Sequence, residues 1–415
     1  WFGWVHGRKC FFIEPHSNDG FFSRGTFYGF ADDALRFAFF TKASLEFMLK
    51  ANKRPAVIHT HDWQTGLLPV LLFEIYKYHG LAEQRVCHTV HNFRHQGIGG
   101  ETVLWATGLC RPDYYYSRDR LQDDFNPAAV NFTKGAIVYS NFFTTVSPQH
   151  AWEARCTDQG NGLGHTLHVH QRKFGGILNG IDYEVYNPEI DPLIARRYSA
   201  DAPEAKYDNK RALRQRLMLR DVYQPIISYV GRLDAQKGLH LIRHSLFYAL
   251  HHGAQFVLLG ASPEVGINNH FWHLKHYLND NADCHLELGF NEELAHLIYA
   301  GSDMMVVPSL YEPCGLTQMI ALKYGTIPMV HAVGGLKDTV FDRDYSERPI
   351  CERNGYVFHQ TDPLALETAA QRAIGLWNLY PSEFRKLIQV AMRSDYSWSE
   401  PAEHYLGIYE YIRHK

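Results

Sequence analysis

Short apolar runs rich in β-branched residues alternate along the chain with longer amphipathic stretches. This alternation predicts an α/β fold with parallel sheets, because parallel strands are joined by crossovers that are usually helices. In the first half the runs predict strands at Lys9–Ile13, Ala56–Thr60, Arg85–Val90, Phe142–Val146 and Gly175–Leu178. In the second half they predict strands at Pro225–Val230, Gln255–Leu259, His285–Leu288, Met304–Val307 and Ile327–His331.

Helical periodicity is clear in two stretches. Apolar residues recur at helical spacing between Ala34 and Met48, which predicts a helix over Asp32–Lys50 with one buried stripe. The tail, Ser399–Ile412, also predicts an amphipathic helix. A polar stretch rich in Asp, Arg and Lys runs from Pro188 to about Arg220, and we expect a domain boundary there.

Length and composition narrow the class of protein. The 415 residues exceed what one hydrophobic core usually serves, so two domains are expected. Lys and Arg total 41 against 44 Asp and Glu, and this net charge of −3 predicts no nucleic-acid or membrane partner. The seven cysteines are scattered without a CxxC pair, which indicates a reducing compartment and no structural zinc. Because residue 1 is Trp and the first residues resemble the interior of a domain, we expect that the natural chain begins earlier.

The segment Met304–Gln318 carries the most information about chemistry. A buried strand is expected to end in a tight turn and to open a helix that runs to Tyr324 and stops at Gly325. Glu312 then lies just before the helix, and the backbone N–H groups of Gly315, Leu316 and Thr317 form an anion site. A lone Glu before a helix can also serve only to complement the helix dipole, but the whole string favours a ligand site.

Two further loops in the second half precede predicted helices. Arg232 and Lys237, in the loop from Gly231 to Gly238, have the spacing to converge on one phosphate group. The alternative for this loop is an ordinary solvated turn. The glycine pair in the loop 332–339 resembles another phosphate-facing turn, which by itself is weak evidence.

In the first half, polar residues follow two predicted strands, at His59–Gln64 and His88–Asn92. Each group follows the carboxyl end of a predicted parallel strand, so both are expected at the same rim of the sheet. Ligands bind at this rim in open α/β sheets. We expect His59 and His61 to point to opposite faces of the sheet, and no third ligand is nearby, so no metal site is predicted. With no glycosidase-like carboxylate pair, GxSxG elbow or Walker loop, the pattern favours a nucleotide-activated substrate held between two α/β domains.

Five strings identify a family. They are HTHDWQTGL at His59–Leu67, HTVHNFRHQG at His88–Gly97, GILNGID at Gly176–Asp182, YVGRLDAQKG at Tyr229–Gly238 and EPCGLTQMIALKYG at Glu312–Gly325. In this order they resemble the glycogen and starch synthases of bacteria and plastids. The segment Phe27–Leu49 is similar to the plant-type classes III and IV and their cyanobacterial relatives.

The resemblance implies a GT-B fold, with two Rossmann-like domains facing across a deep cleft and a C-terminal helix that crosses back to the first domain. The implied limits are 1–187 for the acceptor domain, 188–222 for an interdomain segment, 223–395 for the nucleotide-sugar domain and 396–415 for the returning helix. It further implies retaining transfer of glucose from ADP-glucose to the non-reducing end of an α-1,4-glucan. Neither a metal nor pyridoxal phosphate is expected, and the implied compartment is the bacterial cytoplasm or the plastid stroma.

The resemblance also implies a role for each site residue that matches the family's motifs, position by position. Arg232 and Lys237 would bind the diphosphate and stabilise the departing ADP, and Glu312 would hold the glucose hydroxyls. His91 would contact the glucose 6-hydroxyl, and Asp62 would shape the catalytic and acceptor side. The remaining implied contacts are adenine stacking by Phe290, donor binding by Tyr311, Cys314, Gly315, Leu316 and Thr317, and acceptor contacts by Trp63, Asn92 and Asn179. Cys314 is interpreted as a small packed residue and not as a nucleophile.

One departure keeps alternatives open. The family's Lys-x-Gly-Gly-Leu loop does not occur in this sequence, since it belongs to the text that would precede Trp1. A glucan-binding or priming protein without turnover is therefore one alternative. Another GT-B transferase, of the sucrose or trehalose type, is the second.

Overall fold

The computed structural model describes residues 1–16 and 19–415. The described chain forms two compact units: the first comprises Trp1–Ile177 and Ala402–Lys415, and the second comprises Leu178–Pro401. The helix α16 (Ser399–Arg413) therefore begins in the second unit and continues in the first. The stretch 188–222 lies within the second unit, where its helix α8 (Lys206–Leu217) packs on α11 (Glu292–Gly301). The predicted limits of the domains stay a prediction.

The second unit is built on a six-stranded parallel sheet with the strand order β11-β10-β9-β12-β13-β14. The strands are β9 (Ile226–Val230), β10 (Gln255–Gly260), β11 (Cys284–Leu288), β12 (Met304–Val307), β13 (Ile327–His331) and β14 (Tyr356–Phe358). Every residue of β10, β12 and β13 is buried, as expected for parallel strands covered on both faces. The five strands predicted for this half are confirmed, whereas the short β14 was not predicted.

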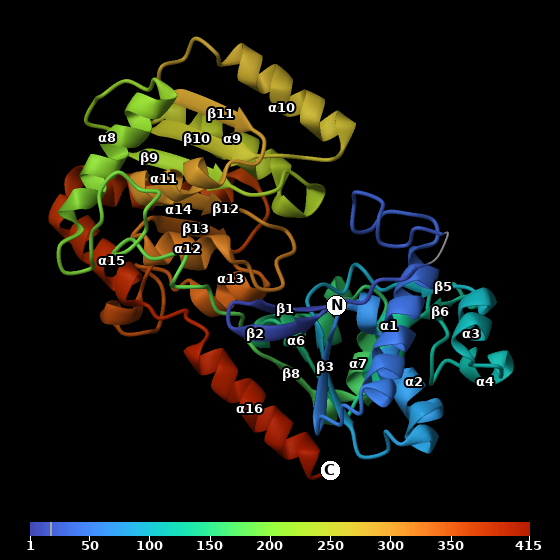
Figure 1. Cartoon of the computed structure of the whole chain (residues 1–415). Helices are drawn as coiled ribbons and strands as arrows, with labels where there is room; N and C mark the ends of the chain where they lie inside the picture. Colours follow the sequence, from blue (N-terminus) through green and yellow to red (C-terminus); the bar gives the residue numbers. More distant parts are fainter. Residues whose placement is uncertain (17–18) are drawn as a thin grey trace. The chain divides into compact units, whose positions relative to one another are not determined.

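Helices cover this sheet, and Figure 1 labels them from yellow-green to red. They are α9 (Leu239–His251), α10 (Val265–Tyr277), α12 (Thr317–Lys323), α13 (Gly334–Thr339), α14 (Pro363–Leu379) and α15 (Pro381–Arg393), together with α8 and α11. The helix predicted after Glu312 is α12, which ends at Lys323 and is followed by Gly325 with a φ of +66°.

The first unit holds a four-stranded parallel sheet with the order β3-β4-β7-β8. Its strands are β3 (Val57–His61), β4 (Arg85–Val90), β7 (Phe142–Thr145) and β8 (Phe174–Gly176). A two-stranded sheet joins β5 (Ile98–Gly99) to β6 (Val130–Asn131) in antiparallel fashion.

One predicted strand of this unit needs correction. The run at Lys9–Ile13 does not join the parallel sheet: its strand is β2 (Arg8–Phe11), which pairs antiparallel with β1 (Phe2–Val5). Between these strands, His6 and Gly7 have φ of 46° and 69°, the left-handed pair that closes a two-residue hairpin. The signal for this hairpin was therefore the His-Gly pair between two short apolar runs.

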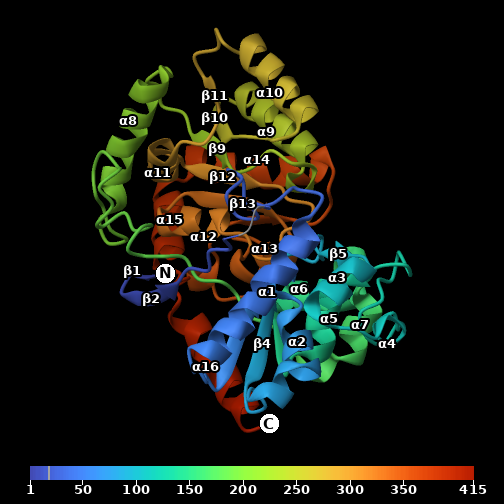
Figure 2. The ribbon, with the colours of Figure 1, turned by 45° about the vertical axis from the view of Figure 1, so that its right-hand side comes forward.

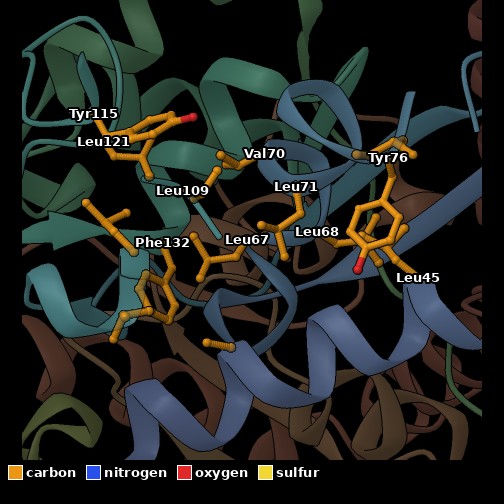
Figure 3. Packing of buried hydrophobic residues seen from close by; sticks show 14 of the residues in the cluster. Leu45, Leu67, Leu68, Val70, Leu71, Tyr76, Leu109, Tyr115, Leu121 and Phe132 are labelled. Carbon is orange, nitrogen blue, oxygen red and sulfur yellow. The ribbon is translucent and has the colours of Figure 1, made fainter. Parts of the chain in front are cut away.

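The predicted helix over Asp32–Lys50 is confirmed as α1 (Asp33–Lys50), which contacts α2 and α3 (Figure 2). The other helices are α2 (Leu68–Glu74), α3 (Glu101–Thr107), α4 (Pro112–Tyr115), α5 (Phe132–Tyr139), α6 (Pro148–Cys156) and α7 (Gly164–Val169). Figure 3 shows the core beside α1, where Leu45 lies near Leu68, Leu71 and Tyr76. This packing holds α1 against α2.

Two further features are the state of the cysteines and the apolarity of the helices. All seven cysteines lie in the described part of the chain, and each carries a free thiol. Across residues 1–16 and 19–415 we find no helix with both the length and the apolarity of a membrane span.

Candidate active site

Two loops of the second unit are joined by their backbones at the carboxyl ends of β9 and β12. The N–H of Leu310 donates to the carbonyl of Gln236 at 2.7 Å. Gly238 adopts a φ of +70°, and a Cβ atom there would lie 2.3 Å from the carbonyl oxygen of Pro308. Only glycine permits this approach, so residue 238 holds the basic loop against the loop that carries Glu312.

The joined loops bring Lys237 and Glu312 together. The Lys237 Nζ lies 2.5 Å from Glu312 Oε2, and the Ser309 hydroxyl donates to the same oxygen at 2.8 Å. Both charged side chains are largely buried, at 18% and 10% exposure. The rim of the second unit therefore carries a fixed ion pair. Ser309 was missed by the sequence analysis, although a hydroxyl three residues before a carboxylate in a tight turn was a usable signal.

The glycine pair Gly334 and Gly335 packs against the Glu312 turn. A Cβ atom on Gly334 would lie 2.1 Å from the Glu312 carbonyl oxygen, and Gly334 has a φ of +47°. The N–H of Gly335 donates to the carbonyls of Glu312 at 3.1 Å and Pro313 at 3.2 Å. Close packing of two backbones thus explains why glycines stand in this loop.

The backbone amides predicted to bind an anion lie at the start of α12 (Thr317–Lys323). The first helical hydrogen bond runs from the N–H of Ile320 to the carbonyl of Leu316 at 2.9 Å. The amides of Gly315, Leu316 and Thr317 precede that bond, so helix geometry leaves them for a ligand. The Thr317 hydroxyl donates to the Val230 carbonyl at 3.4 Å, which ties this helix end to the end of β9.

Tyr311 and Cys314 lie buried behind this turn. Burial raises the pKa of the Cys314 thiol to about 12, and the backbone of Asn179 hydrogen-bonds the same residue. A thiol with that pKa is protonated at neutral pH, which suits a packed residue and not a nucleophile. Asn179 belongs to the second unit.

Arg232 and Phe290 are two exposed members of the predicted set. The Arg232 guanidinium is 67% exposed and lies 3.5 Å from the Asp234 carboxylate. Phe290, between β11 and α11, is 92% exposed. An aromatic ring this open has lost little water contact, so it is available to stack on a ligand.

In the first unit, Asp62 anchors the rim at the end of β3. Its Oδ1 accepts the backbone N–H of His91 at 2.7 Å, and the N–H of Asp62 donates to the Thr89 carbonyl at 2.9 Å. Asp62 has a φ of +55°, an uncommon left-handed value for a residue other than glycine. Burial raises the pKa of the Asp62 carboxyl, although His91 and the backbone bonds from His91 and Asn92 oppose that rise.

Histidine rings gather beside Asp62, and here the prediction for His59 and His61 was wrong. Their rings stack with centroids 4.3 Å apart, because residues two apart on a strand share one face. His61 Nδ1 and His91 Nε2 lie 3.1 Å apart in a hydrogen bond. No group of three or more His, Cys, Asp or Glu side chains with the arrangement of a metal site occurs in the described chain.

The two other predicted acceptor contacts of this unit have clear local roles. The Trp63 ring packs edge-on against Phe37 at 5.0 Å and also lies 6.3 Å from Phe132. Asn92 Oδ1 accepts the backbone N–H of Arg94 at 2.9 Å and so closes the turn after β4. Trp63, next to Asp62, therefore has a packing role, and Asn92, next to His91, closes a turn.

Known proteins match the whole chain. The starch synthase catalytic domain model matches residues 2–169, and the model of glycosyl transferases group 1 matches residues 215–383. Glycogen synthase 1 of Synechococcus sp. (strain JA-3-3Ab) is 64% identical over 414 residues, which cover 100% of this chain and 84% of the relative. Glycogen synthase 2 of Methylococcus capsulatus is 61% identical, with 100% of this chain and 85% of the relative covered.

Solved structures agree with these sequence relatives. The catalytic domain of starch synthase IV from Arabidopsis thaliana, bound to ADP and acarbose, superposes with a TM-score of 0.97 at 40% identity, over 100% of this chain and 84% of that one. A sucrose-phosphate synthase from Thermosynechococcus elongatus shares the fold alone, at 21% identity and a TM-score of 0.59, over 93% of this chain and 80% of that one. The chain belongs to the glycogen and starch synthase family and is a glycosyltransferase with the GT-B fold.

Proposed function

We propose that this enzyme transfers glucose from ADP-glucose to the non-reducing end of an α-1,4-glucan with retention of the anomeric configuration. The observation that carries the proposal is the buried Lys237–Glu312 pair, which the joined loops hold at the rim of the second unit. A cation beside a sugar-binding carboxylate suits a nucleotide-sugar, whose phosphates are anionic and whose sugar is rich in hydroxyls. The starch synthase IV relative was solved with ADP and acarbose, a nucleotide and a sugar-like molecule.

In this reaction the second unit binds and stabilises the leaving group, ADP. Arg232 and Lys237 bind the diphosphate, and the amides of Gly315, Leu316 and Thr317 add donors with the favourable end of the helix dipole. As the bond between glucose C1 and the diphosphate breaks, negative charge grows on the ADP oxygens, and these fixed donors stabilise it. Phe290 stacks on the adenine.

Each unit supplies side chains that suit the transferred sugar. Glu312 accepts hydrogen bonds from the glucose hydroxyls, while Ser309 keeps one carboxylate oxygen in place. His91 contacts the 6-hydroxyl, and its backbone carbonyl lies next to the anomeric carbon. Asp62 fixes that backbone through the His91 N–H, and Trp63, Asn92 and Asn179 belong to the acceptor side.

A transfer assay tests the donor and acceptor together. Glucose labelled with carbon-14 is supplied as ADP-glucose or UDP-glucose, with and without glycogen, and label in precipitated glucan is counted. We expect incorporation from ADP-glucose that depends on glycogen and is several-fold faster than from UDP-glucose. Label on free fructose or glucose phosphate would instead support a sucrose- or trehalose-type transferase. Binding of glycogen without release of ADP would support a protein without turnover.

We further propose that the enzyme works in a reducing compartment that contains ADP-glucose, either bacterial cytoplasm or plastid stroma. The seven free thiols support this compartment, since none is paired with another cysteine. The bacterial sources of the similar glycogen synthases point the same way.

A further inference from the structure

We propose that His61 is a positioning residue that fixes the ring orientation and tautomer of His91 through the hydrogen bond between the two imidazoles. This inference rests on the proposed role of His91 toward the transferred glucose. His61 itself is not among the residues placed on the substrate.

The His61–His91 bond couples the two rings chemically. His61 Nδ1 and His91 Nε2 are 3.1 Å apart, and between two neutral imidazoles one nitrogen must donate and the other must accept. If His91 Nε2 carries the proton, its Nδ1 is an acceptor; if His61 Nδ1 carries it, His91 Nδ1 is the donor. The tautomer of His61 therefore decides which kind of hydrogen bond His91 offers to a sugar hydroxyl.

The neutral state that this coupling requires is supported by the surroundings of His61. Desolvation, and then the nearby His91, lower the pKa of His61 to about 4. The stacked ring of His59 is also held neutral near pH 7, because burial lowers its pKa to about 3. At neutral pH His61 therefore meets His91 as an uncharged ring that can donate or accept at Nδ1.

Other contacts hold His61 itself in place. Its backbone N–H donates to the Thr65 hydroxyl at 2.8 Å, and that hydroxyl donates to the His61 carbonyl at 2.7 Å. The ring beneath it, His59, is fixed at both nitrogens, by the Tyr409 hydroxyl at 2.6 Å and the Thr89 hydroxyl at 2.7 Å. The His61 ring therefore stacks on a ring that is hydrogen-bonded at both nitrogens, and its backbone is hydrogen-bonded to Thr65. Its Nδ1 lies within hydrogen-bond distance of His91.

The geometry supplies a matched set of variants. In His61→Asn the amide lies near the former Nδ1 position and can donate or accept, so it preserves the bond with either tautomer. In His61→Gln the amide reaches the Nε2 position instead, so the bond to His91 is lost although size and polarity are kept. His79→Gln, at the exposed end of the 3-10 helix Tyr76–His79, controls for replacing a histidine elsewhere in the unit.

Steady-state kinetics with ADP-glucose and glycogen then test the inference. We expect His61→Gln to lower kcat by about 3- to 10-fold, the size of one neutral hydrogen bond, with a smaller change in KM. His61→Asn should recover most of this loss, and His79→Gln should match the unchanged enzyme. Equal kcat in His61→Gln and the unchanged enzyme, or an equal loss in His61→Asn and His61→Gln, would overturn the inference.

A double-mutant cycle separates positioning from general damage. If His61 acts through His91, His61→Gln should cause no further loss in a His91→Ala background, whereas independent effects would multiply. Multiplied losses would count against the inference. If His91→Ala alone leaves activity unchanged, the assignment of His91 in the proposed function fails, which is a distinct outcome from an inactive His91→Ala with a fully active His61→Gln.

Nitrogen-15 NMR of ring-labelled histidine measures the tautomer of His91 directly, independently of the catalytic rate. We expect one tautomer for His91 in the unchanged protein and a mixture of two in His61→Gln. A mixture in the unchanged protein would refute the inference directly.

Discussion

The carboxyl ends of the strands carry a lysine–glutamate ion pair in the second unit, whereas histidine rings gather beside Asp62 in the first. In the second unit Lys237 and Glu312 form a nearly buried ion pair. In the first, burial lowers the pKa of His59 and of His88 to about 3, so both rings are uncharged at neutral pH. In the proposed function this difference suits a nucleotide-sugar, because its phosphates need fixed cations, whereas its sugar hydroxyls can pair with a carboxylate such as Glu312 or with neutral rings.

The structural supports of the two rims differ in the same way. Deep in the second unit, Lys206 donates to the carbonyls of Ala300 and Tyr324, each at 3.0 Å, and so joins the ends of α11 and α12. In the first unit the Thr89 hydroxyl links His59 to Thr144, each at 2.7 Å. The support described for the second rim is thus a buried lysine side chain, whereas that described for the first is a chain of hydroxyl and imidazole groups. Each of the following experiments tests that contrast.

The largest effect is expected from breaking the ion pair. Lys237→Ala and Glu312→Gln should each lower kcat by about 100- to 1,000-fold, since a fixed charge contact in a site of this kind contributes about 2.7–4 kcal/mol to the transition state. The rate of ADP release with glycogen as acceptor measures the loss. Lys386→Ala, which removes an exposed lysine paired with Glu383 at 2.8 Å, is the matched control and should retain full activity. Rates within threefold of the unchanged enzyme for both variants would contradict the site.

Acid should weaken the first unit through its neutral histidines. The pKa of His88 is about 3 in the folded protein, because of burial, against an ordinary value of 6.5. Between these values the unfolded chain binds more protons, so stability is complete above pH 6.5 and is lost as the pH falls toward 3. We expect a loss of about 1.4 kcal/mol per pH unit from this ring alone.

Hydrogen exchange resolves this loss within one unit. Free energies of opening for the β4 amides are measured between pH 6 and pH 4 in the unchanged protein and in His88→Asn, which keeps a polar group toward Thr60 but does not titrate. The variant should show the shallower dependence on pH. The β12 amides of the second unit serve as the internal control, and identical slopes for β4 in both proteins would exclude His88 as the cause.

Phe290 tests the uncharged part of the second rim. Phe290→Ala should raise the KM for ADP-glucose by about 2- to 10-fold and leave kcat nearly unchanged, because ring stacking contributes about 0.5–1.5 kcal/mol. Tyr277→Ala, which removes another exposed ring of the same unit, should change neither constant. An unaltered KM in Phe290→Ala would mean that the adenine lies elsewhere.

The smallest effect concerns the support of the first rim by α16. Tyr409→Phe keeps the ring and removes the hydroxyl that lies 2.6 Å from His59 Nδ1. We expect β3 to lose about 1 kcal/mol of protection in hydrogen exchange, the net contribution of one hydrogen bond. Tyr411→Phe, in the same helix and 53% exposed, should have no effect. If the two variants behave alike, the hydroxyl does not support His59.

The pattern of apolar runs predicted the strands of both parallel sheets except the short β14, because strands covered on both faces are rich in apolar residues. It also placed Glu312, Lys237, Asp62 and His91 at strand ends, since polar residues there cannot continue a buried strand. The hairpin β1–β2 was not predicted, because the apolar run of its second strand has the same pattern as a strand of a larger sheet.

Tertiary structure alone decided which of these residues meet. Glu312 contacts Lys237 because Gly238 lets two backbones approach, and nothing in the spacing of positions 237 and 312 reveals that contact. The register of β3 against β4 likewise brings His61 to His91, residues that sequence places far apart. Local preferences follow from neighbours along the chain, whereas a site depends on contacts between distant segments, which only the packed fold supplies.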